Sequence, residues 1–262
     1  MVSIEELDWS NCETTANPIA GRDTPLVIRG LAGNWPLTLA AMQSTDALCD
    51  YLMSFDCGLH LQAMIAEPRQ EGRFFYTRDL ARFNFKRMNG HLTDALDILR
   101  ALEHKPRAPG FYIGSTEIAE YFPGMEKDCS QSLAPDWVSP NIWIGNRSQV
   151  ATHNDHFENI ACVAAGRRRF TLFPPEQESN LYIASDKPSP AGRPISLVNL
   201  KAPDLKRFPR FGQALASASA AELNPGDAIY IPTNWWHNVE SLEAVNILVN
   251  FWWKPQGLSP DE

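Results

Sequence analysis

Residues 150–159 read Val-Ala-Thr-His-Asn-Asp-His-Phe-Glu-Asn, a stretch that sets two potential metal ligands two residues apart. In a β-strand, side chains at such spacing leave the same face, so His153 and Asp155 can point at one centre while Asn154 points away. In a helix the same pair would lie roughly 200° apart around the axis. The β-branched and aromatic residues that follow favour the strand. This stretch therefore predicts a strand that presents a histidine and a carboxylate together.

A third candidate ligand, His237, lies far downstream, directly after two tryptophans. The Pro-Gly-Asp sequence at 225–227 signals a turn, and the apolar residues 228–231 read as a short strand that ends just before this histidine. Two imidazoles and one carboxylate are the protein part of a non-haem iron site, which leaves three coordination positions open. We therefore expect His153, Asp155 and His237 to bind one metal ion, on strands that lie side by side.

Each part of this pattern also has a structural explanation. A His-x-Asp pair occurs often by chance, and a histidine after two tryptophans is usually a hydrogen-bonded core residue. The turn and strand before His237 favour the ligand interpretation. Trp236 and Trp252 are then predicted to wall the pocket and keep water out. His156 adjoins the pair but has the wrong parity for the inner face, so we predict that it supports the ligands from outside or lies at the rim, and is not itself a ligand.

Six motifs, in a fixed order along the chain, carry a resemblance to a known family. They are residues 152–155, 166–175, 207–209, 225–232, 235–237 and 249–252. The chain resembles the JmjC, cupin-8-type, Fe(II)- and 2-oxoglutarate-dependent oxygenases, and within them is most similar to the hypoxia-inducible-factor asparaginyl hydroxylase and its bacterial relatives. The resemblance implies a mainly β, jelly-roll-like double-stranded β-helix with flanking N-terminal helices. It also implies iron(II) at His153, Asp155 and His237, with 2-oxoglutarate and dioxygen as co-substrates.

At one position the chain departs from that family. Most members carry a lysine two residues after the glycine that matches Gly166, and this chain has Arg168. Alternation places Phe170 and Leu172 on the same face, so Arg168 is expected to point inward. A buried guanidinium needs an anion, and the distal carboxylate of 2-oxoglutarate would accept a bidentate fork from it. The alternatives are a solvated basic turn at 167–169, a preference for another oxoacid, or a weakened enzyme.

Three further residues match co-substrate contacts of the similar enzyme. The resemblance implies that Asn159 and Asn250 contact the metal-proximal end of 2-oxoglutarate and that Tyr112 hydrogen-bonds its distal carboxylate. Val150 stands where the relative has a threonine, so one hydroxyl contact is expected to be missing. Thr171 could replace that hydroxyl only from the inner face, and its alternation with the inward-facing arginine places it on the outer one.

Length and composition favour a single domain over residues 1–262, because no Gly/Ser-rich linker divides the chain. Residues 1–105 are expected to form mixed α/β elements that pack on a β-helix of residues 106–262. The segment 182–211, rich in proline and polar residues, is predicted to be a long insertion that covers the site, or else a passive surface loop. The other predicted elements are a strand at 25–29, a helix at 36–53, one or two strands within 59–76 and a helix at 92–103.

The charge balance bears on the partner. With 23 basic and 31 acidic residues the net charge is −8, whereas a nucleic-acid substrate calls for a basic surface. A protein, a peptide or a small molecule is the favoured substrate. No apolar run is long enough for a membrane span, and the N-terminus lacks a signal-peptide pattern. Together with five cysteines that lack metal-like spacing, these features predict a cytoplasmic protein.

The oligomeric state can be predicted from the end of the chain. The similar hydroxylase dimerises through helices after its last barrel strand. Here only eight residues, two of them proline, follow Lys254. We expect a monomer, or a dimer built from another surface.

Three functions fit these residues. The first is an oxygenase that hydroxylates a C–H bond of a polypeptide side chain or small molecule; hydroxylation and demethylation both stay open, because the substrate decides between them. The second is a catalytically weak cupin-like protein that binds or senses a small organic acid, which Arg168 and Val150 favour. The third is a metal-dependent isomerase or sugar-type cupin. The complete set of three ligands favours the first.

Overall fold

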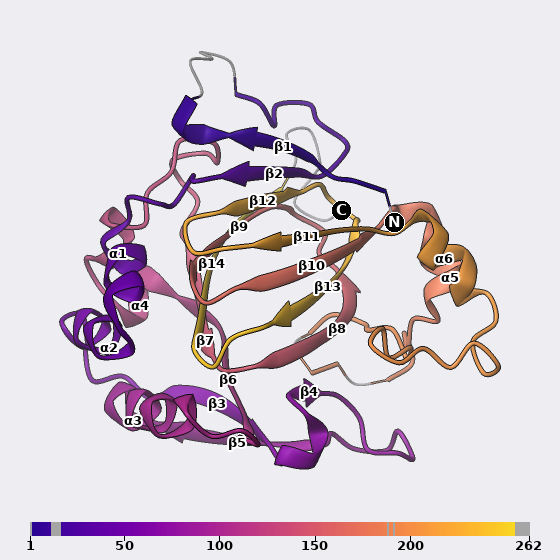
Figure 1. The fold of residues 1–262 in the computed structure, drawn as a ribbon, viewed down its shortest axis with the longest axis horizontal. Helices are drawn as coiled ribbons and strands as arrows, with labels where there is room; N and C mark the ends of the chain where they lie inside the picture. Colours follow the sequence, from indigo (N-terminus) through magenta and orange to yellow (C-terminus); the bar gives the residue numbers. More distant parts are fainter. Residues whose placement is uncertain (1, 12–16, 188, 191, 255–262) are drawn as a thin grey trace.

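The computed structural model describes residues 2–11, 17–187, 189–190 and 192–254. Fourteen strands and six α-helices, with four short 3-10 turns, make up the described part (Figure 1). The strands are β1 (Glu5–Asp8), β2 (Leu26–Arg29), β3 (Leu61–Ala66), β4 (Arg73–Phe74), β5 (Phe85–Gly90), β6 (Gly110–Glu117), β7 (Asn141–Gly145), β8 (Ser148–Asn154), β9 (Glu158–Ala165), β10 (Arg168–Phe173), β11 (Ser219–Leu223), β12 (Ala228–Ile231), β13 (Trp236–Ser241) and β14 (Asn246–Trp253). The helices are α1 (Pro36–Gln43), α2 (Thr45–Met53), α3 (Leu92–Glu103), α4 (Ile118–Tyr121), α5 (Glu178–Leu181) and α6 (Phe211–Ser217).

The strands form two sheets. The larger has nine strands in the order β1-β2-β12-β9-β14-β7-β6-β3-β5, and the smaller has five in the order β11-β10-β13-β8-β4. From β7 to β14 the chain passes back and forth between the two sheets, except that β10 and β11 are antiparallel neighbours in the smaller one. The result is the predicted mainly β, double-stranded β-helix. Its two layers face each other, with β9 and β14 behind β10 and β13 in Figure 1.

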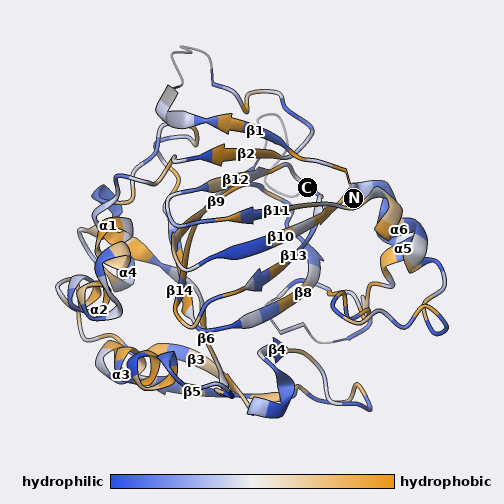
Figure 2. Ribbon diagram, in the orientation of Figure 1, coloured by the Kyte–Doolittle hydropathy of each residue, from blue (hydrophilic) through white to orange (hydrophobic). Residues whose placement is uncertain are grey.

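Two apolar clusters explain why the central strands are buried on both faces. In β9, Ile160 and Cys162 pack towards the helices, whereas Ala161 and Val163 pack between the two sheets. Alternating side chains of a strand leave opposite faces, so a strand covered on both sides reads as a continuous apolar run. Figure 2 shows β14 largely in the hydrophobic colour for this reason.

The N-terminal elements extend the larger sheet and cover it. β3 and β5 join that sheet through β6, and the predicted strand at 25–29 and helix at 92–103 are confirmed as β2 and α3. The single helix predicted at 36–53 is wrong, because the structure has α1 and α2. Ser44 between them is extended, and its Oγ accepts a hydrogen bond from the Ala47 N–H. A serine in this position caps a new helix.

The predicted insertion is confirmed as mostly irregular chain over the described residues between Tyr182 and Arg210, and α6 starts at Phe211. A bridge between Ile183 and Ser196 closes it on itself. The Ser196 N–H also donates to the Thr152 carbonyl at 2.7 Å, which ties the insertion to β8. The insertion therefore lies against the strand that carries the predicted ligands.

Among the described residues, no helix combines the length and apolar character needed to cross a membrane. Cys49, Cys57, Cys129 and Cys162 are free thiols. Residues 255–262, on which the expectation about dimerisation rested, lie outside the described residues. The cytoplasmic location and the oligomeric state stay predictions.

The turn between β9 and β10 requires glycine. Gly166 has φ of +71°, and a Cβ there would lie 2.4 Å from the side-chain oxygen of Asn246 and 2.4 Å from the carbonyl of Val245. We expect Gly166→Ala to lower the free energy of unfolding by on the order of 2–3 kcal/mol, through left-handed strain and overpacking. Urea unfolding measures this change.

The matched control is Gly212→Ala in α6, where a Cβ meets no atom within 4 Å. Alanine favours a helix over glycine, so this variant should be unchanged or slightly more stable. Equal stability losses in the two variants would show that Gly166 has no special role.

Candidate active site

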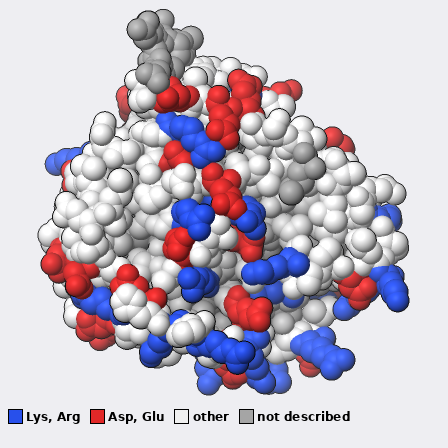
Figure 3. All heavy atoms as spheres, viewed as in Figure 1, with Lys and Arg blue, Asp and Glu red and all other residues white. Residues whose placement is uncertain are grey.

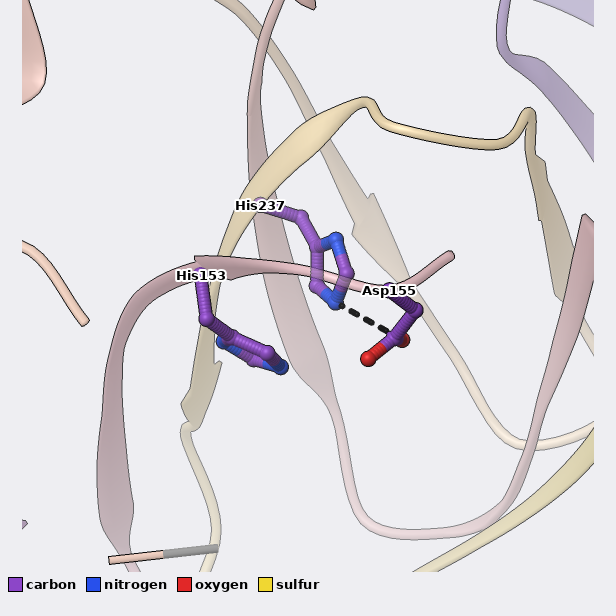
Figure 4. A group of neighbouring side chains, drawn as sticks. All are labelled: His153, Asp155 and His237. Carbon is purple, nitrogen blue, oxygen red and sulfur yellow. Dashed lines mark ion pairs between the residues drawn. The ribbon is translucent and has the colours of Figure 1, made fainter. Parts of the chain in front are cut away.

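Three side chains meet between β8 and β13. His153 lies near the end of β8, Asp155 directly follows that strand, and His237 lies in β13 opposite His153 in the antiparallel register. One ligand atom from each lies within 4.8 Å of the others. Figure 4 shows the three side chains pointing towards one another. The strand pairing thus brings a residue more than 80 positions downstream to the His-x-Asp pair, as the sequence predicted.

Both imidazoles are oriented by the backbone. His153 Nδ1 lies 2.9 Å from the Ala151 carbonyl, and His237 Nδ1 lies 3.1 Å from the Trp235 carbonyl. A carbonyl only accepts, so Nδ1 carries the proton and Nε2 keeps a free lone pair in both rings. This outer hydrogen bond is how metal-binding histidines are commonly fixed in one tautomer.

The electrostatics of His153, Asp155 and His237 favour the binding of a cation. Burial lowers the pKa of His237, and the neighbouring His153 lowers it further, while Asp155 opposes the shift. The imidazole is therefore neutral at neutral pH, the form that binds metals. Its Nε2 lies 3.5 Å from Asp155 Oδ2 (Figure 4). Two imidazole nitrogens beside a carboxylate suit a divalent transition metal.

His156 is a rim residue, as predicted. It is exposed; its Nε2 lies 2.7 Å from Arg193 Nη2 and its Nδ1 lies 3.0 Å from the Asn234 side-chain oxygen. The guanidinium can only donate, so Nε2 accepts and Nδ1 carries the proton. Both nitrogens are occupied away from the three clustered side chains.

A cavity of about 450 Å³ opens beside the three clustered side chains, between the two sheets. This volume falls within the usual range for sites that bind small molecules. It is lined by residues from both sheets, the N-terminal strands and the insertion. They include Met64, Arg87, Tyr112, Trp143, Val150, His153, Asp155, Phe157, Asn159, Arg168, Pro190, Arg193, His237, Leu248, Asn250 and Trp252.

Arg168 points into this cavity and has no anion. Arg168 is 1% exposed, and its Nε and Nη2 have no hydrogen-bond partner among the residues that the structure describes. Burial lowers the pKa of Arg168 to about 10. A buried, unpartnered guanidinium is unfavourable, so this end of the cavity is built to receive an acid. The residues present therefore fit a carboxylate co-substrate.

The two residues that flank Arg168 in sequence face the other way. Arg167 pairs with Glu222 and Glu243, and Arg169 pairs with Glu222 and Glu240. Figure 3, in the same view as Figure 1, shows basic and acidic residues interspersed over the face on which β10 and β11 lie. The alternative of a fully solvated basic turn is thus wrong for Arg168, because strand alternation separates it from Arg167 and Arg169.

Sequence comparison agrees with the geometry. Residues 13–258 match the protein family described as cupin-like domain. The chain belongs to this family. The cluster of His153, Asp155 and His237 and the cavity beside it thus lie in the β-helix of a cupin-like domain.

Several curated proteins are similar to this cupin-like chain. "Lysine-specific demethylase JMJ31" of Arabidopsis thaliana is 35% identical over 90% of this chain and 47% of its own length. "HSPB1-associated protein 1" of Homo sapiens is 37% identical over 42% of this chain and 22% of its own length. "Bifunctional peptidase and (3S)-lysyl hydroxylase JMJD7" of Homo sapiens is 28% identical over 60% of this chain and 57% of its own length. The chain thus spans less than two thirds of each relative's length.

The other co-substrate residues predicted for this cupin-like domain also line the cavity. Burial raises the pKa of Tyr112 to about 12, so its hydroxyl stays protonated and can donate. The side-chain amide of Asn250 donates to the Asn159 side-chain oxygen at 2.7 Å, whereas the Asn250 oxygen is buried without a partner. The pair leaves an acceptor free inside the cavity.

The predicted pocket wall is half right. Trp252 lines the cavity, but Trp236 does not. Trp236 packs outside with Phe173 and Phe211, because alternation along β13 turns it away when His237 points in. Val150 lines the cavity and Thr171 faces outward, as expected, so the missing hydroxyl is not replaced from β10.

Sequence reasoning missed several cavity residues, and three of them come from strands of the larger sheet. Arg87 on β5 and Trp143 on β7 belong to no recognised motif, and Met64 comes from β3. β3 and β5 reach the cavity only because the N-terminal elements extend the larger sheet, whereas β7 belongs to the β-helix itself. The alternation of β7, with Ile142 and Ile144 in the core on one face, was the one available signal for Trp143 on the other.

Proposed function

We propose that this chain is an Fe(II)- and 2-oxoglutarate-dependent oxygenase that hydroxylates a C–H bond of a polypeptide side chain or small molecule. One observation carries the proposal. Two imidazoles and a carboxylate converge at one side of a cavity whose other polar end is an unpartnered, buried guanidinium. This arrangement suits a metal ion at the three side chains and a dicarboxylate that extends from the metal to Arg168.

The residues have separate tasks in this proposal. His153, Asp155 and His237 would hold iron(II) on one face and leave the opposite face open. Arg168 and Tyr112 would bind the distal carboxylate, and the Asn159–Asn250 pair would orient the metal-proximal end. Bound iron and 2-oxoglutarate would supply the oxidising chemistry with dioxygen.

The protein's own contribution is orientation and exclusion of water. Apolar side chains such as Val150, Leu248 and Trp252 line the cavity. A dry wall strengthens the charge interactions inside it. The roles of Tyr112, Asn159 and Asn250 in this proposal come from the resemblance to the asparaginyl hydroxylase. The names of the relatives include a demethylase and a hydroxylase, so they agree with demethylation as well as with stable hydroxylation of the substrate.

The test needs no prime substrate. Under argon, iron(II) should bind at one ion per chain, and addition of 2-oxoglutarate followed by air should yield succinate slowly. Iron is measured colorimetrically and succinate by mass spectrometry. Binding of iron and 2-oxoglutarate without succinate would instead favour the alternative, a catalytically weak cupin-like protein that binds or senses a small organic acid.

A further inference from the structure

Two arginines at the cavity are not used by the proposed chemistry. Arg87 and Arg193 line it together with Arg168, and Asp155 is the one carboxylate among the lining residues. If Asp155 binds the metal and Arg168 binds the co-substrate, two guanidiniums remain. Neither has an acidic partner within the described part of the chain, whereas Arg167 and Arg169 on the outer face each have two.

Arg87 is held in place without being neutralised. Its guanidinium lies 5.5 Å from the ring centre of Phe83 and 5.4 Å from that of Phe85. Its Nη2 donates to the Pro190 carbonyl at 2.9 Å. Aromatic faces and a carbonyl orient the side chain, which is exposed and can therefore contact a ligand that enters the cavity.

Arg193 reaches the same region from the insertion. Its Nε donates to the Asn154 carbonyl at 2.9 Å, and its Nη2 donates to the Asn154 side-chain oxygen at 3.0 Å. Pro190, which accepts from Arg87, lies only three residues before it. The two guanidiniums are therefore fixed on one segment of the cavity wall, and one of them braces the strand between the predicted ligands.

The apolar wall points to the same kind of ligand. Trp143 and Trp252 line the cavity, and the indole N–H of each is buried without an acceptor. Their rings meet edge to face at 5.8 Å. A buried donor without an acceptor is unfavourable, so a ligand rich in acceptors would satisfy groups that the protein leaves open.

We propose that the prime substrate is an anion whose carboxylate binds Arg87 and Arg193. This inference rests on the proposed function, because it assigns the substrate of the same site. A lysine side chain, the residue in the names of two relatives, would place an ammonium beside two guanidiniums with no free carboxylate. The carboxylate belongs to an acidic residue of a peptide or to a free amino acid.

The experiment uses the protein loaded with iron(II) and 2-oxoglutarate under argon. Equilibrium dialysis measures binding of four probes: the capped pentapeptides Ala-Ala-Asp-Ala-Ala and Ala-Ala-Lys-Ala-Ala, free aspartate and free lysine. We expect each acidic probe to bind about tenfold more tightly than its basic counterpart, the effect of one charge-assisted hydrogen bond. Tighter binding of the peptide assigns a polypeptide source, and tighter binding of aspartate assigns a small acid.

Arg87→Glu tests the residue itself. It should remove the preference for the acidic probe, a change of about tenfold or more in the ratio of the two dissociation constants. Arg69→Glu is the matched control, because Arg69 is 77% exposed and lies outside the cavity lining. Arg193 is a poorer choice, since it also holds Asn154 beside the predicted ligands.

The outcomes separate this inference from the proposed function. The visible charge-transfer absorption that forms when 2-oxoglutarate joins iron(II) reports the co-substrate complex. If it forms in the parent and in Arg87→Glu, yet both bind acidic and basic probes alike, the anionic substrate is wrong and the oxygenase stands. If it does not form in the parent, the proposed function fails first. Arg87→Gln, which should lose the preference without reversing it, replaces Arg87→Glu if that variant does not fold.

Discussion

Asp155→Ala is expected to abolish iron binding and succinate formation, with a loss on the order of 100-fold or more in metal affinity. Removal of the carboxylate takes away the one anionic ligand and leaves two neutral imidazoles, and affinity at such sites depends on ligand type and geometry. His153→Ala and His237→Ala should behave alike, since each leaves two ligands. Bound iron per chain and succinate yield are the measurements, with circular dichroism to confirm that the fold is kept.

His156→Ala is the matched control for these three variants. His156 adjoins Asp155 in sequence, but its two ring nitrogens face Arg193 and Asn234. Iron stoichiometry should therefore hold in this variant. If His156→Ala lost the iron and His153→Ala kept it, the inward and outward faces assigned here to β8 would have to be exchanged.

Arg168→Ala is expected to weaken 2-oxoglutarate binding by on the order of 2–5 kcal/mol, the range for loss of one partner of a buried charge pair. The distal carboxylate would then lie in a buried site without a cation. Arg168→Lys should be milder but not neutral, because an ammonium cannot reproduce the planar fork. The measurements are the apparent KM for 2-oxoglutarate, which should rise, and the iron stoichiometry. The iron stoichiometry should not change, because the three ligands are intact.

A third substitution separates binding from folding. In the ligand-free protein Arg168 is a buried cation without an anion, and exchange of such a group for an apolar one is often neutral or stabilising by about 1–4 kcal/mol. Arg168→Leu should therefore keep or raise the melting temperature while it loses 2-oxoglutarate binding. A lower melting temperature with unchanged 2-oxoglutarate binding would mean that Arg168 is structural.

The matched control is Arg169→Ala, one residue along the same strand. Arg169 points outward and its pair with Glu222 is exposed, whereas its second partner, Glu240, has a side chain that is 15% exposed. Surface pairs contribute about 0–1 kcal/mol to stability. Neither the KM for 2-oxoglutarate nor the iron content should change, so any effect of Arg168 beyond this control belongs to the inner face.

From the sequence by itself, the β-helix follows only from the resemblance that the six ordered motifs carry, whereas the candidate ligands follow from residue types and their spacing. Alternation along a strand decides that His153 and Asp155 share a face, that Arg168 points in and that its neighbours point out. The same rule, applied to Trp235, Trp236 and His237, would have placed Trp236 outside the cavity. The prediction for Trp236 is wrong because a residue next to His237 in a strand points to the opposite face.

Only the tertiary structure decided which other side chains reach the cavity. Arg87 comes from a strand added to the edge of the larger sheet, and Arg193 comes from an irregular insertion that folds back on β8. Neither position follows from a local period, since sheet order and loop path are set by packing between segments distant in sequence. The break of the predicted helix at Ser44 has the same origin, because α1 packs on β9 whereas α2 packs on α1 and α3. Local pattern thus predicted the His-x-Asp pair and the inward arginine, and long-range packing placed His237, Arg87 and Arg193 at the cavity.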